Sequence, residues 1–322
     1  MNIVEPTDKN LKLAANLIKK GELVAFPTET VYGLGADGLN PLAVAKIFET
    51  KERPSFNPLI LHISGVNQID LIANFENVKI NNLIKKFWPG PLTIVVPKKE
   101  TVPDIVTAGN ETVAIRMPNH PVALRLIDLI GNPIAAPSAN MFGRLSPTTA
   151  EHVYKQLGNK VKLILNGGKC RIGVESTILG VKEDKIFLLR PGGISKEEIE
   201  SVIGKLDNRE EQLKSPDSPG QLPYHYAPRI PIKFLDRNSV NETEWKSAGV
   251  LLFKKSGLGK KFKVAKTLSP DGNLREAAAN LFNCLHDLEK ENINKIFVEP
   301  VPETGLGVAI MDRLKKAVNK YL

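Results

Sequence analysis

The sequence Lys51-Glu-Arg-Pro-Ser-Phe-Asn-Pro-Leu-Ile-Leu-His62 joins the end of a predicted helix to a predicted strand. Pro41, directly after Asn40, suits the first turn of that helix, which we expect to continue through Phe48. The apolar run at 59–63 has the length and composition of a buried strand. A helix followed at once by a buried strand indicates a layered α/β fold.

The same stretch places two cations, Lys51 and Arg53, and the titratable ring of His62 close together, between the end of the helix and the strand. We interpret this grouping as an anion pocket. An alternative is that the cations form a solvated helix end, which the helix dipole favours, and that His62 is a core histidine. The spacing alone does not choose between these interpretations.

Upstream, the sequence Phe26-Pro-Thr-Glu-Thr-Val-Tyr-Gly-Leu-Gly35 follows a short apolar strand at 23–26. Proline and glycine punctuate this segment, and hydroxyl side chains are frequent in it. We therefore expect a polar recognition loop through Gly35, next to the anion pocket.

Short apolar runs and helical patterns alternate along the rest of the chain, which predicts an α/β protein with a mixed sheet. At 322 residues the chain is long enough for two domains. Periodicity is lost over 205–229, so we expect a first domain at 1–204, a linker at 205–229 and a small parallel, Rossmann-like α/β domain at 230–322. Gly305-Leu-Gly307 suits either a weak phosphate loop or a strand-to-helix turn.

Composition limits the classes of protein to consider. Two cysteines are too few for a disulfide framework or a cysteine-rich metal site. No apolar run approaches the roughly 20 residues of a membrane helix, and no secretory signal is present, so we expect a cytoplasmic protein without membrane contact. The net charge of +9 suits nucleic-acid binding, but the basic residues are spread over both predicted domains.

The chain resembles the two-domain, long form of the YrdC-type threonylcarbamoyl-AMP synthases. The two stretches above carry that family's Pro-Thr-Glu-Thr-x-Tyr-Gly-Leu loop, its Lys-x-Arg-Pro segment and its Pro-Leu-x-x-His strand. Further similar blocks are Trp88-Pro-Gly-Pro-Leu-Thr93, Val113-Ala-Ile-Arg-Met-Pro118, Ala136-Pro-Ser-Ala-Asn140, Ser146-Pro-Thr148, Gly173-Val-Glu-Ser-Thr177, Leu189-Arg-Pro-Gly-Gly193, residues 218–228 and Gly305-Leu-Gly-Val-Ala-Ile310. The resemblance implies a strongly twisted mixed sheet with a concave pocket.

It also implies the reaction: L-threonine, bicarbonate and ATP give threonylcarbamoyl-AMP and pyrophosphate, for threonylcarbamoyl-adenosine modification of tRNA. Such chemistry needs positioning and electrostatic stabilisation and no covalent nucleophile. By motif match, Lys51 and Arg53 are the catalytic phosphate-binding cations. The match implies a threonine site of Thr30, His62, Arg116, the backbone of Ala136, and Ser176. It implies an ATP site of Arg53, Asn57, Thr112, Ser138, Ser146, Arg190 and Tyr226.

Magnesium is expected with ATP, held mainly by phosphates and water, and no protein ligand to it is assigned. The linker departs from the family pattern, since Gln221, Leu222, Pro223 and Tyr224 replace a segment that usually carries two cations. His225 and Tyr226 remain, and we expect the linker to act as a lid through the aromatic group Tyr224-His-Tyr226. Because the lid is taken as a surface loop, Tyr226→Ala should scarcely change stability.

Two alternative functions stay open. Hydrogenase-maturation carbamoyltransferases share the YrdC fold, but they carry zinc-binding cysteine pairs and this sequence has no Cys-x-x-Cys. An RNA-binding maturation factor would explain the net charge. The partners to consider are therefore tRNA and the proteins that receive the unstable product.

Overall fold

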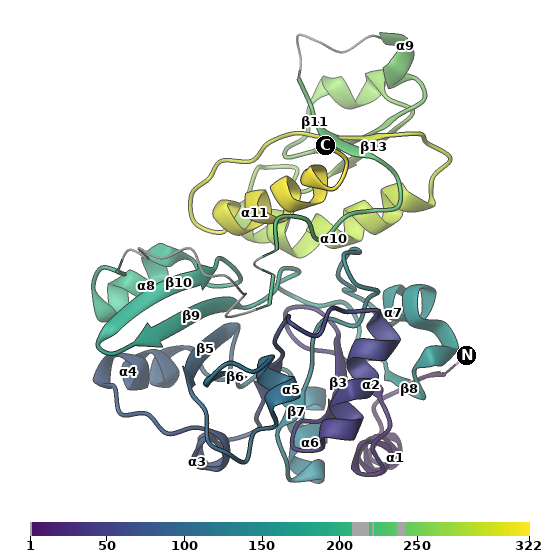
Figure 1. Ribbon diagram of the computed structural model, residues 1–322. Helices are drawn as coiled ribbons and strands as arrows, with labels where there is room; N and C mark the ends of the chain where they lie inside the picture. Colours follow the sequence, from purple (N-terminus) through teal and green to yellow (C-terminus); the bar gives the residue numbers. More distant parts are fainter. Residues whose placement is uncertain (1, 208–218, 221, 237–241) are drawn as a thin grey trace.

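The computed structural model describes residues 2–207, 219–220, 222–236 and 242–322. Two sheets organise these residues, one of ten strands and one of four (Figure 1). Every strand of the larger sheet ends by Arg190, and the smaller sheet begins at Ile232. The α/β class predicted from the sequence is confirmed.

The larger sheet is mixed, as predicted, because parallel pairs such as β4–β6 alternate with antiparallel pairs such as β5–β6. In spatial order its strands are β1 (Ile3–Val4), β8 (Leu163–Leu165), β2 (Val24–Phe26), β3 (Gly33–Asp37), β7 (Ile134–Ala135), β4 (Ile60–His62), β6 (Thr112–Arg116), β5 (Leu92–Pro97), β9 (Thr177–Lys182) and β10 (Lys185–Arg190).

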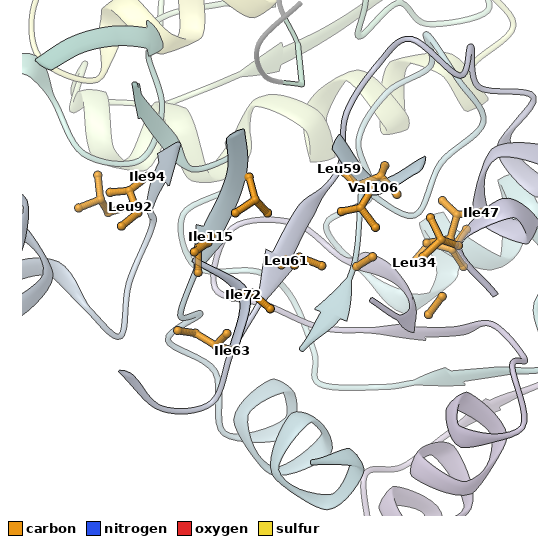
Figure 2. Close-up of a cluster of buried hydrophobic side chains, with 14 of the residues drawn as sticks. Leu34, Ile47, Leu59, Leu61, Ile63, Ile72, Leu92, Ile94, Val106 and Ile115 are labelled. Carbon is orange, nitrogen blue, oxygen red and sulfur yellow. The ribbon is translucent and has the colours of Figure 1, made fainter. Parts of the chain in front are cut away.

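Strand alternation places the apolar side chains of this sheet in clusters on both faces. On one face, Val24 and Phe26 pack with helices α1 (Asp8–Lys19) and α6 (Pro121–Ile130). On the other face, Ala25 and Leu61 join the main core, part of which Figure 2 shows around Leu61 and Ile115. The longer helices that contribute to this core are α2 (Pro41–Lys51), α4 (Val78–Phe87), α7 (Ala150–Leu157) and α8 (Lys196–Ile203).

Short elements complete the first part of the chain. They are the helices α3 (Ile69–Ile72) and α5 (Asp104–Thr107) and the 3-10 turns Val66–Gln68 and Gly158–Lys160. Within the described residues, no helix is long and apolar enough to cross a membrane.

The second sheet is wholly parallel, in the order β11 (Ile232–Phe234), β14 (Ile296–Val298), β12 (Gly249–Leu252) and β13 (Val264–Thr267). Helices α10 (Leu274–Lys290) and α11 (Gly307–Asn319) lie between this sheet and the first part of the molecule (Figure 1). The remaining elements here are α9 (Glu242–Trp245) and the 3-10 turn Gly257–Lys261. The predicted parallel C-terminal unit is confirmed.

One buried contact between the two parts is a pair of histidines. His152 of α7 and His286 of α10 stack with their ring centroids 3.9 Å apart. The Nε2 atom of His286 lies 3.1 Å from the carbonyl oxygen of Ser146, and Thr148 Oγ1 lies 3.3 Å from His152 Nδ1. Burial lowers the pKa of His152 to about 4 and that of His286 to about 3, so both rings are neutral near pH 7.

The segment Gly33–Asp37 is strand β3, and the prediction of a loop through Gly35 is wrong there. Two glycines argue against a strand when the sequence is taken locally. In the structure they face Phe26 on β2, and a Cβ at Gly35 would lie 2.8 Å from the phenyl ring. The glycines therefore make room for Phe26 across the antiparallel pair.

Helix α2 also extends further than expected, through Lys51 rather than Phe48. It ends at Glu52, whose φ of 53° places it in the left-handed region. Residues 208–218 and Gln221 of the predicted linker lie outside the described residues.

Candidate active site

A pocket lies at the face of the larger sheet that carries Ile60 and His62. Its cavity volume is about 50 Å³, room for about four water molecules. The lining residues that the sequence analysis assigned to ligands are Thr30, Arg53, His62, Arg116, Ala136, Ser138, Ser176, Arg190 and Tyr226. Segments far apart in the sequence therefore meet at one site.

The amino-terminal wall combines a guanidinium with hydroxyl groups. Arg116, at the end of β6, donates from Nη2 to Thr30 Oγ1 at 2.9 Å and from Nε to the carbonyl oxygen of Gly90 at 3.3 Å. Thr30 Oγ1 also lies 2.9 Å from Thr28 Oγ1. Arg116 forms an ion pair with buried Glu29 at 2.8 Å. Its Nη1 has no acceptor among the described residues, which leaves one donor nitrogen for a ligand.

His62 stands on the neighbouring strand, opposite Arg116 in the register of β4 and β6. Its Nδ1 lies 3.2 Å from the carbonyl oxygen of Ile60. Burial and then the charge of Arg116 lower its pKa to about 3. The ring is consequently neutral, so one nitrogen donates and the other accepts.

Arg190, the last residue of β10, is held by the segment that precedes β9. Its Nη2 donates to the carbonyl oxygen of Ser176 at 2.9 Å and to Ser176 Oγ at 3.1 Å. Ser176 Oγ is in turn 2.7 Å from Thr93 Oγ1 on β5. Arg190 Nη1 donates to the carbonyl oxygen of Pro219 at 3.2 Å, so linker residues close one side of the pocket.

Arg53 is the third buried guanidinium of the pocket. It donates from Nη2 to the carbonyl oxygen of Pro58 at 2.9 Å and from Nε to that of Asn57 at 3.2 Å. Burial, together with the charge of Arg190, lowers its pKa to about 9, which still leaves it charged at neutral pH. Close burial of like charges makes this site favourable for an anion.

Four assigned residues lie outside the pocket lining. Lys51 Nζ donates to the backbone carbonyls of Ser138, at 2.6 Å, and of Asn140. Burial and then Arg53 lower the Lys51 pKa well below its ordinary value. The side-chain amide of Asn57 is buried, and neither of its polar atoms has a partner among the described residues. Lys51 thus braces the loop of Ser138 in this structure.

Ser146 and Thr112 are the other two. Ser146 is fully buried, and its Oγ donates to Glu175 Oε1 at 2.5 Å. Thr112 begins β6 and shares the strand face of Arg116, four residues away, which puts about 13 Å between them. At Ala136, which does line the pocket, the backbone N–H already donates to the carbonyl oxygen of Ile60 at 3.0 Å.

His225 and Tyr226 cover the pocket from the linker side. The Tyr226 side chain is 2% exposed and packs against Phe282 of α10 with ring centroids 5.7 Å apart. Its φ of 62° is in the left-handed region, which costs energy for a side chain of this size. The expectation that Tyr226 behaves as a surface-loop residue is therefore wrong, whereas Tyr224 is 53% exposed.

Sequence reasoning did not assign Thr28 or Glu175, although both stand inside motifs that it quoted. Glu175 is the one carboxylate among the described lining residues. Burial opposes its ionisation, but Arg313, Arg190 and the Ser146 hydroxyl outweigh burial and lower its pKa. Arg313 is in the C-terminal helix α11, where local sequence gave no sign of a contact with the site.

Comparison with known families matches two adjoining stretches of the chain. Residues 16–192 match the family described as "Telomere recombination", which groups the Sua5, YciO and YrdC proteins. Residues 194–318 match the "Threonylcarbamoyl-AMP synthase, C-terminal domain". The chain belongs to the threonylcarbamoyl-AMP synthases, in their two-domain form.

Relatives agree over the whole chain. The chain is 44% identical to the threonylcarbamoyl-AMP synthase of Bacillus subtilis, covering 96% of this chain and 93% of that protein. It is 43% identical to that of Pyrococcus abyssi, with 95% and 93% covered. The crystal structure of P. abyssi Sua5 complexed with L-threonine superposes with a TM-score of 0.89 at 41% identity, covering 98% of this chain and 96% of that one.

This threonylcarbamoyl-AMP synthase is thus an ATP-using enzyme, a nucleotidyltransferase that serves tRNA modification. The family match rules against the carbamoyltransferase and the purely RNA-binding alternatives. No cluster of three or more potential metal ligands occurs among the described residues.

Proposed function

We propose that Arg116 binds threonine and that Arg53 and Arg190 bind ATP, for a reaction in which threonine is carbamoylated and then adenylated. The threonine amine takes up bicarbonate with loss of water and forms a carbamate. A carbamate oxygen then attacks the α-phosphorus of ATP, and the bond from that phosphorus to the pyrophosphate oxygen breaks. The observation that carries this proposal is the convergence of three buried guanidiniums on one small, hydroxyl-lined pocket.

For the threonine half, we assign the carboxylate to Arg116, supported by its Nη1, which has no described acceptor. A guanidinium pairs well with a carboxylate when both are desolvated. Thr30, neutral His62 and Ser176 surround the remaining space and suit a small side chain that bears a hydroxyl. Because the Ala136 N–H is already used, only its carbonyl is assigned to the amino acid.

For the nucleotide half, we assign the phosphates to Arg53 and Arg190. Ser138 lines the same wall, and the unpartnered amide of Asn57 supports a polar contact next to Arg53. Lys51 uses two of its three ammonium donors on the carbonyls of Ser138 and Asn140, so it fixes Ser138 and keeps one donor for a phosphate. The remaining assignments to ATP are Thr112, Ser146 and Tyr226.

Magnesium is part of the proposal as a companion of ATP. Mg²⁺ keeps several of its waters and binds through phosphates more than through protein cages, so we assign it no protein ligand. When bound, the ion neutralises phosphate charge. The chain's own cations, Arg53 and Arg190, share that task with it.

We also propose a division into residues 1–204, a linker at 205–229 and residues 230–322. The linker residues His225 and Tyr226 act as a lid. The Tyr226 ring lines the cavity of about 50 Å³ beside Arg53 and Arg190, so we expect the ring to move when the nucleotide enters. Closure behind the ligands would exclude water from the carbamate. The candidate recipients of the product are tRNA and the proteins that transfer the threonylcarbamoyl group.

The test is mass spectrometry of the product formed from ATP and bicarbonate with threonine, with serine or with no amino acid. We expect a threonine-dependent AMP adduct together with pyrophosphate. Formation of the same adduct without amino acid, or none with threonine, would overturn the reaction. In parallel, ATP and threonine together should change protease cleavage in 205–229, and identical cleavage with and without ligands would overturn the lid.

A further inference from the structure

The glycine-containing turn Gly305-Leu-Gly307 sets the start of helix α11. Gly305 has a φ of 51°, and a Cβ at Gly307 would lie 1.8 Å from the carbonyl oxygen of Pro302. A larger residue at Gly307 would therefore displace the helix start. Nearly two turns later, the same helix buries Arg313, which is 1% exposed and the largest fully buried side chain among the described residues.

Arg313 reaches out of the C-terminal domain into the first one. Its Nε donates to Glu175 Oε2 at 2.9 Å, and its Nη1 donates to the carbonyl oxygen of Pro191 at 2.8 Å. The adjacent Asp312 accepts from Nη1 at 2.7 Å. Pro191 directly follows Arg190, and Glu175 directly precedes Ser176. The guanidinium of Arg313 therefore contacts the two chain segments that carry Arg190 and Ser176 into the pocket.

Two further contacts connect Arg313 with the proposed nucleotide site. The other oxygen of Glu175 accepts the hydroxyl of Ser146, which this carboxylate therefore orients. The guanidinium carbon of Arg313 lies 5.2 Å from the centre of the Tyr226 ring, a cation–π distance. By contrast, the described hydrogen bonds and ion pairs of Arg313 include no contact with Thr30, His62 or Arg116.

We infer that Arg313 is a positioning residue for the ATP half of the site, through which the C-terminal domain aligns Glu175, Ser146 and the Tyr226 ring. The inference rests on the proposed assignment of Ser146 and Tyr226 to ATP. A gain in folding stability does not explain the buried Arg313–Glu175 ion pair well, because the cost of desolvating a buried ion pair offsets most of its Coulombic gain. A positioning role explains why the planar guanidinium of Arg313 donates to the Glu175 carboxylate and to the Pro191 carbonyl at the same time.

The test uses the full-length enzyme and steady-state kinetics of Arg313→Lys. Lysine keeps the charge but has no planar fork, so it cannot hold Glu175 and Pro191 together. We expect the KM for ATP to rise at least about tenfold, the KM for threonine to stay within about twofold, and kcat to fall less than the ATP KM rises. A purely structural role would lower the active fraction, and therefore kcat, with both KM values unchanged. That result would overturn the inference.

Two companion variants keep the outcome interpretable. If Arg313→Lys does not fold, the double variant Arg313→Met with Glu175→Gln removes both charges and is measured in its place; an unchanged ATP KM there also overturns the inference. Arg275→Met is the matched control, since Arg275 makes an exposed ion pair with Glu198 between the two domains at 2.9 Å, and its ATP KM should match the wild type.

Ser146→Ala separates this inference from the proposed function. An unchanged ATP KM in Ser146→Ala removes the nucleotide assignment itself. If the ATP KM rises in Ser146→Ala but is unchanged in Arg313→Lys, the nucleotide assignment is retained and only the positioning role of Arg313 is refuted.

Discussion

The stability of Tyr226 variants tests directly whether the Tyr226 ring packs against Phe282 in solution. Removing a buried aromatic ring typically costs about 3–5 kcal/mol of unfolding free energy. Tyr226 is 2% exposed and contacts Phe282, and we take the lower end of that range. For a domain of 150–250 residues, each kcal/mol shifts Tm by about 2–4 °C. Tyr226→Ala should therefore lower Tm by about 6–12 °C.

The assay is differential scanning calorimetry of the ligand-free enzyme, with Tyr224→Ala as the matched control. Tyr224 is two residues away and 53% exposed, so its loss should shift unfolding by no more than about 0.5 kcal/mol. Tyr226→Phe keeps the ring and should stay close to the wild type. If Tyr226→Ala shifts Tm no more than Tyr224→Ala does, the ring is not packed in the free enzyme, and the reasoning from its burial fails.

Three other outcomes follow from the site. Arg53→Ala should reduce product formation at least about a hundredfold, the scale of losing one preorganised electrostatic contact, and wild-type turnover in a mass-spectrometric assay would remove Arg53 from the chemistry. Arg116→Ala should weaken threonine binding by about 2–5 kcal/mol in calorimetry while ATP binding changes much less; equal losses for both ligands would count against the assignment. Acid should destabilise the enzyme between about pH 6.5 and pH 4, because the unfolded chain binds protons that buried His152 and His286, with pKa values of about 4 and 3, do not. His286→Phe should reduce the slope of unfolding free energy against pH, measured by denaturant titration, by up to about 1.4 kcal/mol per pH unit. An unchanged slope would refute the role of this pair.

Local sequence predicts those elements whose pattern reflects their own burial. The run at 59–63 reads as a buried strand because alternate side chains fill apolar clusters on both faces of the sheet, and β4 occupies it. Strand β3 does not read as a strand, because its two glycines are required by the ring of Phe26 on the neighbouring strand. This requirement arises only when the two strands pair, so the strand propensities of the individual residues cannot predict it.

The same distinction applies to the site. Arg53, Arg116 and Arg190 stand in contiguous motifs, so the resemblance identified them, and they line one pocket. Arg313 meets Glu175 across 138 residues, and nothing in the local sequence of a C-terminal helix names its partner. The motifs in a chain therefore predict which groups belong to a site better than they predict which groups hold them there.

The electrostatics of the pocket explain why such holding groups are needed. Arg53 and Arg190 are both more than nine-tenths buried, and burial lowers the pKa values of both, together with the charge of Arg190 at Arg53 and the charge of Arg313 at Arg190. Backbone carbonyls at Asn57, Pro58, Ser176 and Pro219 accept their donors, but carbonyls carry no net charge to offset the repulsion. Glu175 supplies one negative charge, and Arg313 keeps it ionised and fixed. The cationic excess that remains favours an anion, as the proposed ATP site requires, and donors that are already fixed in place need little reorganisation when the anion binds.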